Sequence, residues 1–497
     1  MELRSTETIE LLPHSGGTVR AMSRIGYDFG AAAADVIDNS IDANASLVEI
    51  RIFRSDREIT TVSISDNGDG MNRSELLRGM QFGGKIEHEV GDLGAFGMGL
   101  KTASFSQCKT LTVISKKSPS DFIACRWRYE NIGNGWACEI FEDAGVQKIF
   151  EKFSHRNKSA LSGTVVLWER LDRLGVGPAD GALDEFLNTF LPRLEVYLGM
   201  VFHRFISSGA LEICISVKHE RRSMAIPRAV RPLDPFGYRQ SGDPLWPRSL
   251  LAKIPPAGNI RLMAHIWPYG SQDPNFLMGG KTGVEWQGFF FYRNNRLIQA
   301  GGWNDVLKST SDPTLSLARV SVDMPPVGVD VNVQKTSLQI SAAQAHSLIA
   351  ATDGEETLET YLEQARQVYK SGRSVKRVNS NRIVPGKGLP MAVRKYSAQV
   401  LNGGRLGEEV DFVWLSMPRR KVFDIDIMGK RLVLNDRYRR VILRDARASA
   451  ADAPIFKLLL FLLLQSDFAM QRSSSKQEAR LRAYNDMLLS VMEHLDK

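Results

Sequence analysis

The stretch ADVIDNSIDANA, residues 34–45, decides the fold. It closes an Ala-rich, Pro-free segment that starts at Ile25, and the alternating run SLVEIRIF follows it, so we expect a helix and then a strand. In such a helix Asp35 and Asn39 are four residues apart on one face. An Asn carbonyl oxygen suits Mg²⁺, and a carboxylate one turn earlier can hold an attacking water and accept its proton. A solvated polar face that ends in a capping Asn or Asp is the alternative.

A second motif, DNGDGM at residues 66–71, closes the strand-like run TVSIS. A carboxylate at a strand end, here Asp66, can accept a hydrogen bond from the exocyclic amine of a base, and glycines let that base approach the backbone. A plain Asn-Gly or Asp-Gly turn is the alternative. A calcium loop is excluded, because Gly68 stands where a ligand is needed and the Glu at the twelfth position is missing.

The densest glycine stretch is GDLGAFGMGLKT, residues 91–102. Backbone N–H groups of such a loop can cradle phosphates, and Lys101 adds positive charge. The stretch departs from a P-loop because Leu100 precedes the Lys-Thr pair, and its GxxGxG order is not the dinucleotide fingerprint. A glycine loop without a ligand is the alternative for this segment taken alone.

The order of these motifs, completed by SGTVV at residues 162–166, resembles the GHKL ATPase superfamily, which includes gyrase B, Hsp90, MutL and sensor histidine kinases. Within this superfamily, the residues of the motifs are most similar to those of the MORC family and its prokaryotic relatives. The segments GFFFYRNNRLIQAGGW, residues 288–303, and VNVQKTSL, residues 331–338, resemble parts of the second domain of MORC proteins. The resemblance covers about the first 340 residues.

The resemblance implies ATP and Mg²⁺ as cofactors and assigns roles to individual residues. Asn39 would ligate Mg²⁺, Asp35 would be the general base, and Lys335 would reach the γ-phosphate. Asp66 would read the adenine amine, supported by the hydroxyl of Thr164. The other residues that it places around the nucleotide or in its lid are Gly68, Gly70, Met71, Lys85, Gly94, Gly97, Gly99, Lys101 and Thr102.

One position departs from the family pattern. The general base is usually a Glu, whereas this chain has Asp35, which is shorter by one methylene. Because a small misplacement of a catalytic group costs a large rate factor, we expect a slow Mg²⁺-dependent ATPase that acts as a switch.

The expected fold class is α+β. Residues 1–175 would form a Bergerat-type α/β sandwich, residues 176–340 an S5-like α/β transducer, and residues 341–497 a basic, mainly helical region. The second domain would start with a helical segment over 183–205 and continue with strands near 211–217, 260–266 and 288–293. A Ser/Lys/Asn/Gly-rich linker is expected over 371–388.

Composition excludes several classes of protein. The chain has 497 residues, of which 43% are hydrophobic and 24% charged, so it can bury more than one core and is not mainly disordered. Its four cysteines lack metal-site or disulfide spacing, and its N-terminus lacks an apolar signal segment. The apolar run Ile455–Leu464 is too short to span a membrane and predicts a buried core helix. We therefore expect a cytoplasmic protein without a membrane partner.

Positive charge is concentrated in one region. The net charge is +8, but residues 366–447 hold 20 Lys and Arg against 7 Asp and Glu. The clusters MPRRK and RYRR, with Tyr396, Trp414 and Tyr438 between or beside them, predict contacts with DNA phosphates and bases. A solvated basic surface, or docking onto an acidic partner, is the alternative.

The MORC resemblance implies an ATP-dependent homodimer that clamps DNA. Its prokaryotic relatives tend to occur with restriction and defence genes, so partner proteins of such a system are an expectation. An Hsp90-like chaperone or protein-remodelling switch is the alternative. A histidine kinase is disfavoured because no phosphoacceptor hairpin precedes the ATP motifs, and a MutL-type nuclease because the last 150 residues show no clustered metal-ligand motif.

Overall fold

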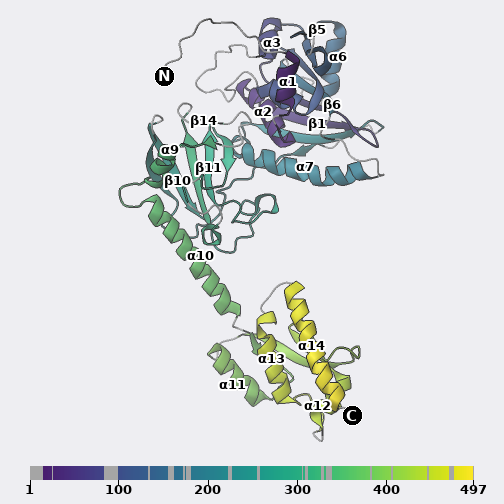
Figure 1. Cartoon of the computed structure of the whole chain (residues 1–497), viewed down its shortest axis with the longest axis vertical. Coiled ribbons are helices and arrows are strands. Elements are labelled where there is room, and N and C mark those ends of the chain that lie inside the picture. Colours follow the sequence, from purple (N-terminus) through teal and green to yellow (C-terminus); the bar gives the residue numbers. More distant parts are fainter. Residues whose placement is uncertain are drawn as a thin grey trace, which may run out of the picture. The chain divides into compact units, whose positions relative to one another are not determined.

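The structure of the protein is a computed structural model. It describes residues 15–24, 26–82, 99–132, 135–154, 162–171, 174, 181–221, 227–254, 258–304, 306–307, 312–325, 330–331, 338–380, 383–403, 407–444, 447–468 and 475–495. The chain divides into two compact units, residues 1–369 and 370–497 (Figure 1). Helices and sheets occur in both units, which confirms the α+β class.

The first unit starts with a mixed sheet of eight strands in the order β5-β4-β3-β6-β2-β1-β7-β8. The strands are β1 (Leu47–Arg54), β2 (Ile59–Asp66), β3 (Cys108–Lys116), β4 (Ile123–Arg128), β5 (Glu139–Phe141), β6 (Gly163–Leu171), β7 (Glu212–His219) and β8 (Arg228–Ala229). The helices around it are α1 (Ser15–Ser23), α2 (Phe29–Asp42), α3 (Arg73–Met80), α4 (Gly99–Phe105), α5 (Tyr129–Ile132), α6 (Ala144–Phe153), α7 (Ala182–Val201) and α8 (His203–Ser207).

Strand alternation gives this sheet two apolar faces. Val48, Ile50 and Ile52 of β1 pack in the larger core with α2 and α7, while Phe53 belongs to a smaller core with Phe150 of α6. Successive side chains of a strand point to opposite faces, so helices cover the sheet on both sides (Figure 1). This arrangement is the α/β sandwich that the motifs predicted.

The strand expected near 211–217 is present, but it does not belong to the second α/β unit in which the sequence analysis placed it. It is β7, and it pairs in parallel with β1 of the first sheet, from Leu47 opposite Glu212 to Arg54 opposite His219. The physical reason is that α7 lies against the core of the first sheet and returns the chain to its edge, where Ile213 and Ile215 are buried in the same core. A parallel connection through a helix needs no second domain.

A second sheet in this unit has five strands in the order β12-β11-β13-β10-β9. They are β9 (Arg248–Ile254), β10 (Gly258–Ile266), β11 (Gly288–Arg293), β12 (Arg296–Ala300) and β13 (Ala318–Met324). Short elements near it are η1 (Met278–Gly280), η2 (Pro313–Leu315) and the two-stranded pair β14 (Asp330–Val331) and β15 (Leu338–Gln339). Leu348 of α9 (Ala342–Ile349) and Tyr361 of α10 (Leu358–Ser380) are buried in its core.

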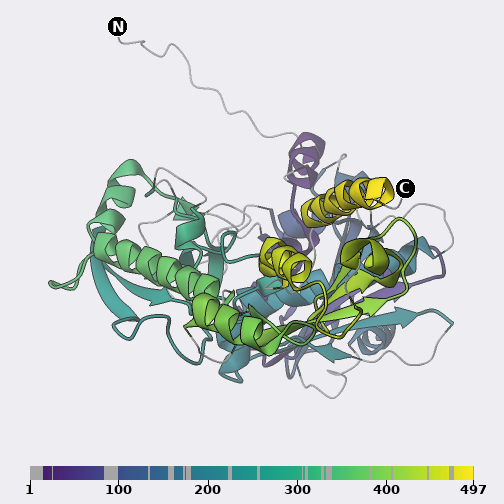
Figure 2. The same ribbon diagram turned by 90° about the horizontal axis from the view of Figure 1, so that it is seen from below.

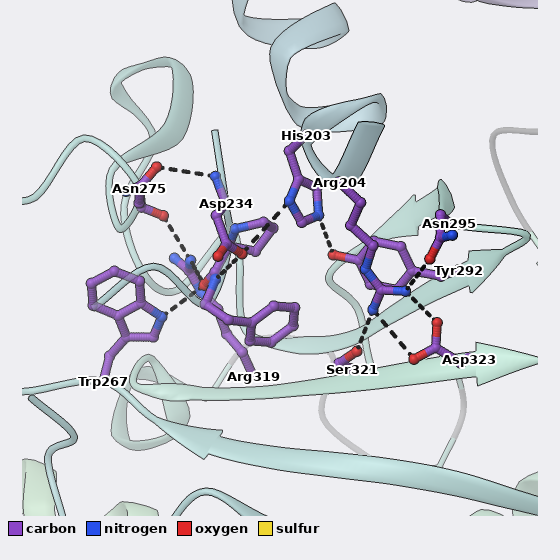
Figure 3. A network of polar contacts seen from close by, with 12 residues as sticks. His203, Arg204, Asp234, Trp267, Asn275, Tyr292, Asn295, Arg319, Ser321 and Asp323 are labelled. Atoms are coloured by element: carbon purple, nitrogen blue, oxygen red, sulfur yellow. Dashed lines mark hydrogen bonds and ion pairs between the residues drawn. The ribbon is translucent and has the colours of Figure 1, made fainter. Parts of the chain in front are cut away.

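A polar network attaches α8 to this second sheet (Figure 3). His203 shares a hydrogen bond of 2.9 Å with the hydroxyl of Tyr292, and Arg204 lies 3.6 Å from the centroid of the same ring and pairs with Asp323. Deeper in the network the buried guanidinium of Arg319 donates to three backbone carbonyls, those of Pro235, Asn275 and Phe276. Because α8 directly follows α7, this network joins the two sheets of the unit.

The second unit contains a four-stranded sheet, which the sequence analysis did not foresee in a region expected to be mainly helical. Its strands are β16 (Ile383–Pro385), β17 (Glu408–Leu415), β18 (Phe423–Asp426) and β19 (Arg431–Asn435). Its helices are α11 (Met391–Asn402), η3 (Asp436–Tyr438), α12 (Arg439–Leu443), α13 (Pro454–Phe468) and α14 (Ser475–Leu495), the last in yellow in Figure 2. The expected linker over 371–388 is occupied by the end of α10 and by β16.

The apolar run after Ile455 forms α13, but only one of its faces is buried. Leu460, Phe461 and Leu464 lie in the core, whereas Ile455 and Leu459 are exposed. Lys457 lies on the buried side, where its Nζ donates to the carboxylate of Asp452 and to the carbonyl of Gly388, each at 3.0 Å. The expected buried core helix is therefore buried on one face only, because its other face carries exposed apolar side chains. Among the described residues, no helix has the length and apolar character that crossing a membrane requires.

The network around His203 predicts an acid-sensitive stability. Burial lowers the pKa of His203 to about 4, against the opposing charge of Asp234. An unfolded His titrates near 6.5, so as the pH falls from 6.5 to 4 the unfolded chain binds a proton that the folded chain does not, and stability is lost. We expect His203→Gln to lose less stability than the wild type, by on the order of 3 kcal/mol, because the buried His265, whose pKa is also lowered to about 4, contributes to the loss in both proteins. Urea unfolding at pH 7 and pH 4.5, followed by tryptophan fluorescence, measures it; an equal loss in both proteins would contradict it.

Candidate functional site

Helix α2 holds two of the predicted site residues. It starts at the N-cap Asp28, whose side chain accepts from the amide of Gly30, and all of its residues from Phe29 to Ser40 are buried except Asn39. The Nδ2 group of Asn39 donates to the backbone carbonyl of Asp35 at 3.0 Å. The Nδ2 group of Asn39 is thus hydrogen-bonded within the helix. Its Oδ1 can act as an acceptor, because the Asn39 side chain is exposed.

This geometry fits Asn39 as a ligand of Mg²⁺. A neutral amide oxygen is a hard ligand, and Mg²⁺ in nucleotide sites usually keeps water and phosphate oxygens as its other ligands. Within the described ranges, no group of three or more His, Cys, Asp or Glu side chains could hold a metal ion by itself.

The predicted base, Asp35, lies on the buried part of α2. Its Oδ2 accepts a hydrogen bond of 2.9 Å from the hydroxyl of Tyr27, and its Oδ1 lies 3.8 Å from Nη2 of Arg296, a residue of β12. Gly99, the first residue of α4, lies so close that a Cβ there would be 3.6 Å from Oδ2. The structure thus brings together two residues that the sequence analysis placed in separate motifs, Asp35 and Gly99.

Asp66 lies at the end of β2 and is held by three donors. Its Oδ1 accepts from the amides of Gly68 at 3.0 Å and Thr164 at 3.2 Å, and its Oδ2 accepts from the hydroxyl of Ser40 at 3.0 Å. Burial raises the pKa of Asp66 to about 6, although the three hydrogen bonds oppose this shift. The carboxylate is therefore mostly ionised at neutral pH in a buried position, as an acceptor for an amine requires.

The role expected for the Thr164 hydroxyl needs correction. Thr164 supports Asp66 through its backbone amide, because the two residues are partners in the antiparallel register of β2 and β6. Its hydroxyl instead shares a hydrogen bond of 2.9 Å with Ser115 on the neighbouring strand β3. The register places Thr164 between two strands, and its side chain binds to the other one.

The loop after Asp66 is shaped by close backbone packing. A Cβ at Gly68 would meet the carbonyl of Ala43 at 2.6 Å, and one at Gly70, where φ is +69°, would meet the carbonyl of Lys116 at 1.8 Å. The amide of Met71 then donates to Ser115 at 2.8 Å. Both glycines are therefore required by the path of the chain, whatever they contact in a nucleotide.

The lysine of the glycine-rich motif points elsewhere than expected. Lys101 is buried, and its Nζ donates to the carbonyls of Gly79 and Gln81 at 2.8 and 2.9 Å, at the C-terminal end of α3. Burial lowers its pKa to about 8, and the adjacent Thr102 is buried as well. In this structure Lys101 thus stabilises the end of α3, because the free carbonyls there attract a cation. The predicted lid and phosphate contacts Lys85, Gly94, Gly97 and Lys335 lie outside the described residues.

Sequence reasoning missed three residues of this site. Ser40 was visible inside the first motif, next to Asn39, and a hydroxyl one residue after a predicted ligand was a signal that could have been used. Tyr27 and Arg296 gave no such signal. Tyr27 precedes the motif, Arg296 lies far along the chain, and each contacts Asp35 only in the folded protein.

A basic surface is built in the second unit from two segments that are separate in the sequence. The Nδ2 group of Asn435 donates to the carbonyl of Lys421 at 2.6 Å, and the hydroxyl of Tyr438 donates to that of Arg419. These bonds hold the segment of Arg419 and Arg420 against the segment of Arg437 and Arg440, and these four exposed arginines are called the basic surface. Within the described ranges none of the four has an ion-pair partner.

Two of the three aromatic residues expected to stack with bases are engaged elsewhere. Tyr438 is buried because its hydroxyl holds the Arg419 segment, and Trp414 donates from Nε1 to Asp452 at 2.9 Å. Arg439 is also unsuited to phosphate contact, since it pairs with the same carboxylate at 2.7 Å. Tyr396 on α11 remains exposed.

Comparison with known proteins supports the ATPase assignment of the first motifs. Residues 27–159 match the model of a family described as histidine kinase-, DNA gyrase B- and HSP90-like ATPase. This range contains α2, the Asp66 loop and α4, so the first domain is supported as a GHKL-type ATPase domain. A search of curated proteins gives no match.

One similar solved structure is titled "Crystal Structure of N terminal domain of a DNA repair protein". It is 18% identical, and the match covers 71% of this chain and 98% of that one. The TM-score is 0.38, which is too low for the likeness to bear on fold or function.

The packing of the Asp66 loop predicts that Gly70 cannot be replaced. In Gly70→Ala the new Cβ meets a backbone carbonyl at a left-handed φ, so we expect a loss of roughly 3 kcal/mol or more in unfolding free energy. Gly79→Ala is the matched control, because its site in α3 is open and Ala is the better helix former, by about 1 kcal/mol. Urea unfolding of the full chain compares the two; equal stability would show that the loop does not follow this path.

Proposed function

We propose that this protein is a slow, Mg²⁺-dependent ATPase that dimerises when it binds ATP and acts as a clamp or switch on DNA. The observation that carries the proposal is the arrangement on and beside α2. There Asn39 is the exposed residue of the otherwise buried residues 29–40 of α2, and Asp66 is a buried carboxylate held by three donors. The family match to residues 27–159 supports the nucleotide-binding part.

Different residues would bind the nucleotide and catalyse its hydrolysis. Asp66 would accept the adenine amine, because Gly68, Ser40 and Thr164 hold its carboxylate in place. Asn39 would hold Mg²⁺, which would offset the negative charge of the phosphates when bound. Asp35 would accept the proton of the attacking water, and its short side chain is the reason for slow turnover.

The DNA part of the proposal rests on the basic surface. Many basic residues of the second unit are neutralised locally, for example Lys421 by Asp424 and Arg431 by Asp426, both at 2.7 Å. The four arginines of the basic surface are exposed, and they lie on two segments that hydrogen bonds hold together. Exposed arginines on two such segments suit a polyanion with regularly spaced phosphates. A defence or restriction system, with its partner proteins, is the biological setting that we propose.

Separate variants should divide nucleotide binding from hydrolysis. We expect Asp66→Ala to weaken ATP binding by roughly 10- to 100-fold, since it removes a charged hydrogen-bond acceptor. Asp35→Ala should keep the affinity and lose hydrolysis by about 100-fold or more, while Asp35→Glu should raise the rate. Calorimetry and single-turnover hydrolysis measure the two quantities.

Ser63→Ala is the matched control for the binding measurement, because Ser63 lies on the same strand as Asp66 but its hydroxyl donates to the carbonyl of Phe153. It should bind ATP like the wild type. Equal hydrolysis by Asp35→Ala and the wild type would remove Asp35 from the mechanism.

Charge removal should test the clamp. We expect Arg419→Ala/Arg440→Ala to weaken DNA binding and to lower the slope of log affinity against log salt by about 2, one unit for each lost phosphate contact. Arg57→Ala/Arg78→Ala, an equal change of charge at exposed positions of the first unit, should leave both unchanged. Fluorescence anisotropy with duplex DNA at several salt concentrations provides the measurement.

Light scattering with ADP and with a non-hydrolysable ATP analogue, with and without DNA, tests whether the mass and the DNA retention of the same variants depend on the nucleotide. The clamp requires a dimer and stronger DNA retention with the analogue. Mass and retention that ignore the nucleotide would overturn it, and client binding unaffected by DNA would favour the chaperone-like switch.

A further inference from the structure

A buried arginine of the second sheet reaches the helix that carries Asp35. Arg296 begins β12, the edge strand of that sheet, directly after the two-residue turn of Asn294 and Asn295. Both turn residues have positive φ, 47° and 66°, and the turn pairs Arg296 with Arg293. The start of β12 is therefore fixed by a tight hairpin, and the side chain of Arg296 is fully buried.

The guanidinium of Arg296 lies against two carboxylates on one face of α2. Its Nε is 2.7 Å from Oδ1 of Asp38, and its Nη2 is 3.8 Å from Oδ1 of Asp35. Asp35 and Asp38 are three residues apart, so they lie next to each other on the helix. All three side chains are almost entirely removed from solvent.

Asp35 is thus held from two directions. Tyr27, which precedes α2, donates to Oδ2, and Arg296 approaches Oδ1 from a sheet that lies more than 250 residues further along the chain. A planar guanidinium can span two carboxylates, whereas the point charge of a lysine cannot. Because the Asp side chain is short, the direction of its carboxylate decides whether it reaches a water at the phosphate.

We propose that Arg296 is a positioning residue for ATP hydrolysis, which orients the carboxylate of Asp35 when the second sheet is packed on α2. The inference rests on the proposed function, in which Asp35 is the base, and it makes the second sheet part of the hydrolytic site. Asp66 is held by Ser40, Gly68 and Thr164, so ATP affinity should not depend on Arg296.

The test compares Arg296→Lys and Arg296→Met in the full chain. We expect single-turnover hydrolysis to fall by roughly 100-fold in Arg296→Met, the size of effect that a misplaced catalytic group produces. Arg296→Lys should lie between this variant and the wild type. The dissociation constant of ATP should stay unchanged in both, and a parallel loss of affinity and rate would overturn the proposal.

A double variant separates positioning from stability. Arg296→Met leaves two carboxylates buried without their cation and can unfold the protein, whereas Asp38→Asn/Arg296→Met removes one negative charge together with the positive one. We expect the double variant to regain the unfolding temperature of the wild type and to keep the low rate. Asp38→Asn alone is the control. A wild-type rate in a stable double variant would overturn the positioning role.

The outcomes distinguish this inference from the proposed function. If Asp35→Ala hydrolyses ATP like the wild type, or if the wild type does not hydrolyse ATP, the proposed function fails and this inference fails with it. If Asp35→Ala is inactive while Asp38→Asn/Arg296→Met is fully active, the base assignment stands and only the role of Arg296 is overturned.

Discussion

The burial of charge on α2 is the constraint on which the first unit depends. A helix whose side chains are almost all enclosed must find partners for its carboxylates inside the protein, since an unpaired buried charge is costly. Asp38 and Asp35 find one in Arg296 of the second sheet, and Asp35 finds another in Tyr27. The candidate base and the contact between the two sheets are therefore parts of the same cluster.

The opposite end of α2 determines the second half of the site. Ser40 donates to Asp66, and the register of β2 and β6 brings the amide of Thr164 to the same carboxylate. Gly68 and Gly70 let the following loop turn against Ala43 and Lys116 without side-chain atoms. One helix thus connects the proposed hydrolytic position near Gly99 to the proposed base-reading position at Asp66, about one turn and a half apart.

The second unit shows how local pairing shapes a basic region. Its excess of positive charge is large, but Asp424, Asp426 and Asp452 neutralise neighbouring cations, and Lys457 is buried against Asp452. What remains exposed is a smaller group, brought together by Asn435 and Tyr438. The side chains that hold the two segments of this surface together, Asn435 and Tyr438, are themselves buried.

The sequence by itself determined the α+β class and helix α2 with the strands that follow it, and it singled out Asp35, Asn39 and Asp66 as candidate site residues, because each lies in a short motif whose local structure follows from nearby residues. It also showed where positive charge accumulates. Only the tertiary structure decided that β7 joins the first sheet, that Thr164 acts through its amide, that Lys101 is directed to the end of α3, and that Tyr438 is buried. These outcomes depend on strand register and on contacts between distant segments, such as Arg296 with Asp38, and no local pattern specifies which segments will meet.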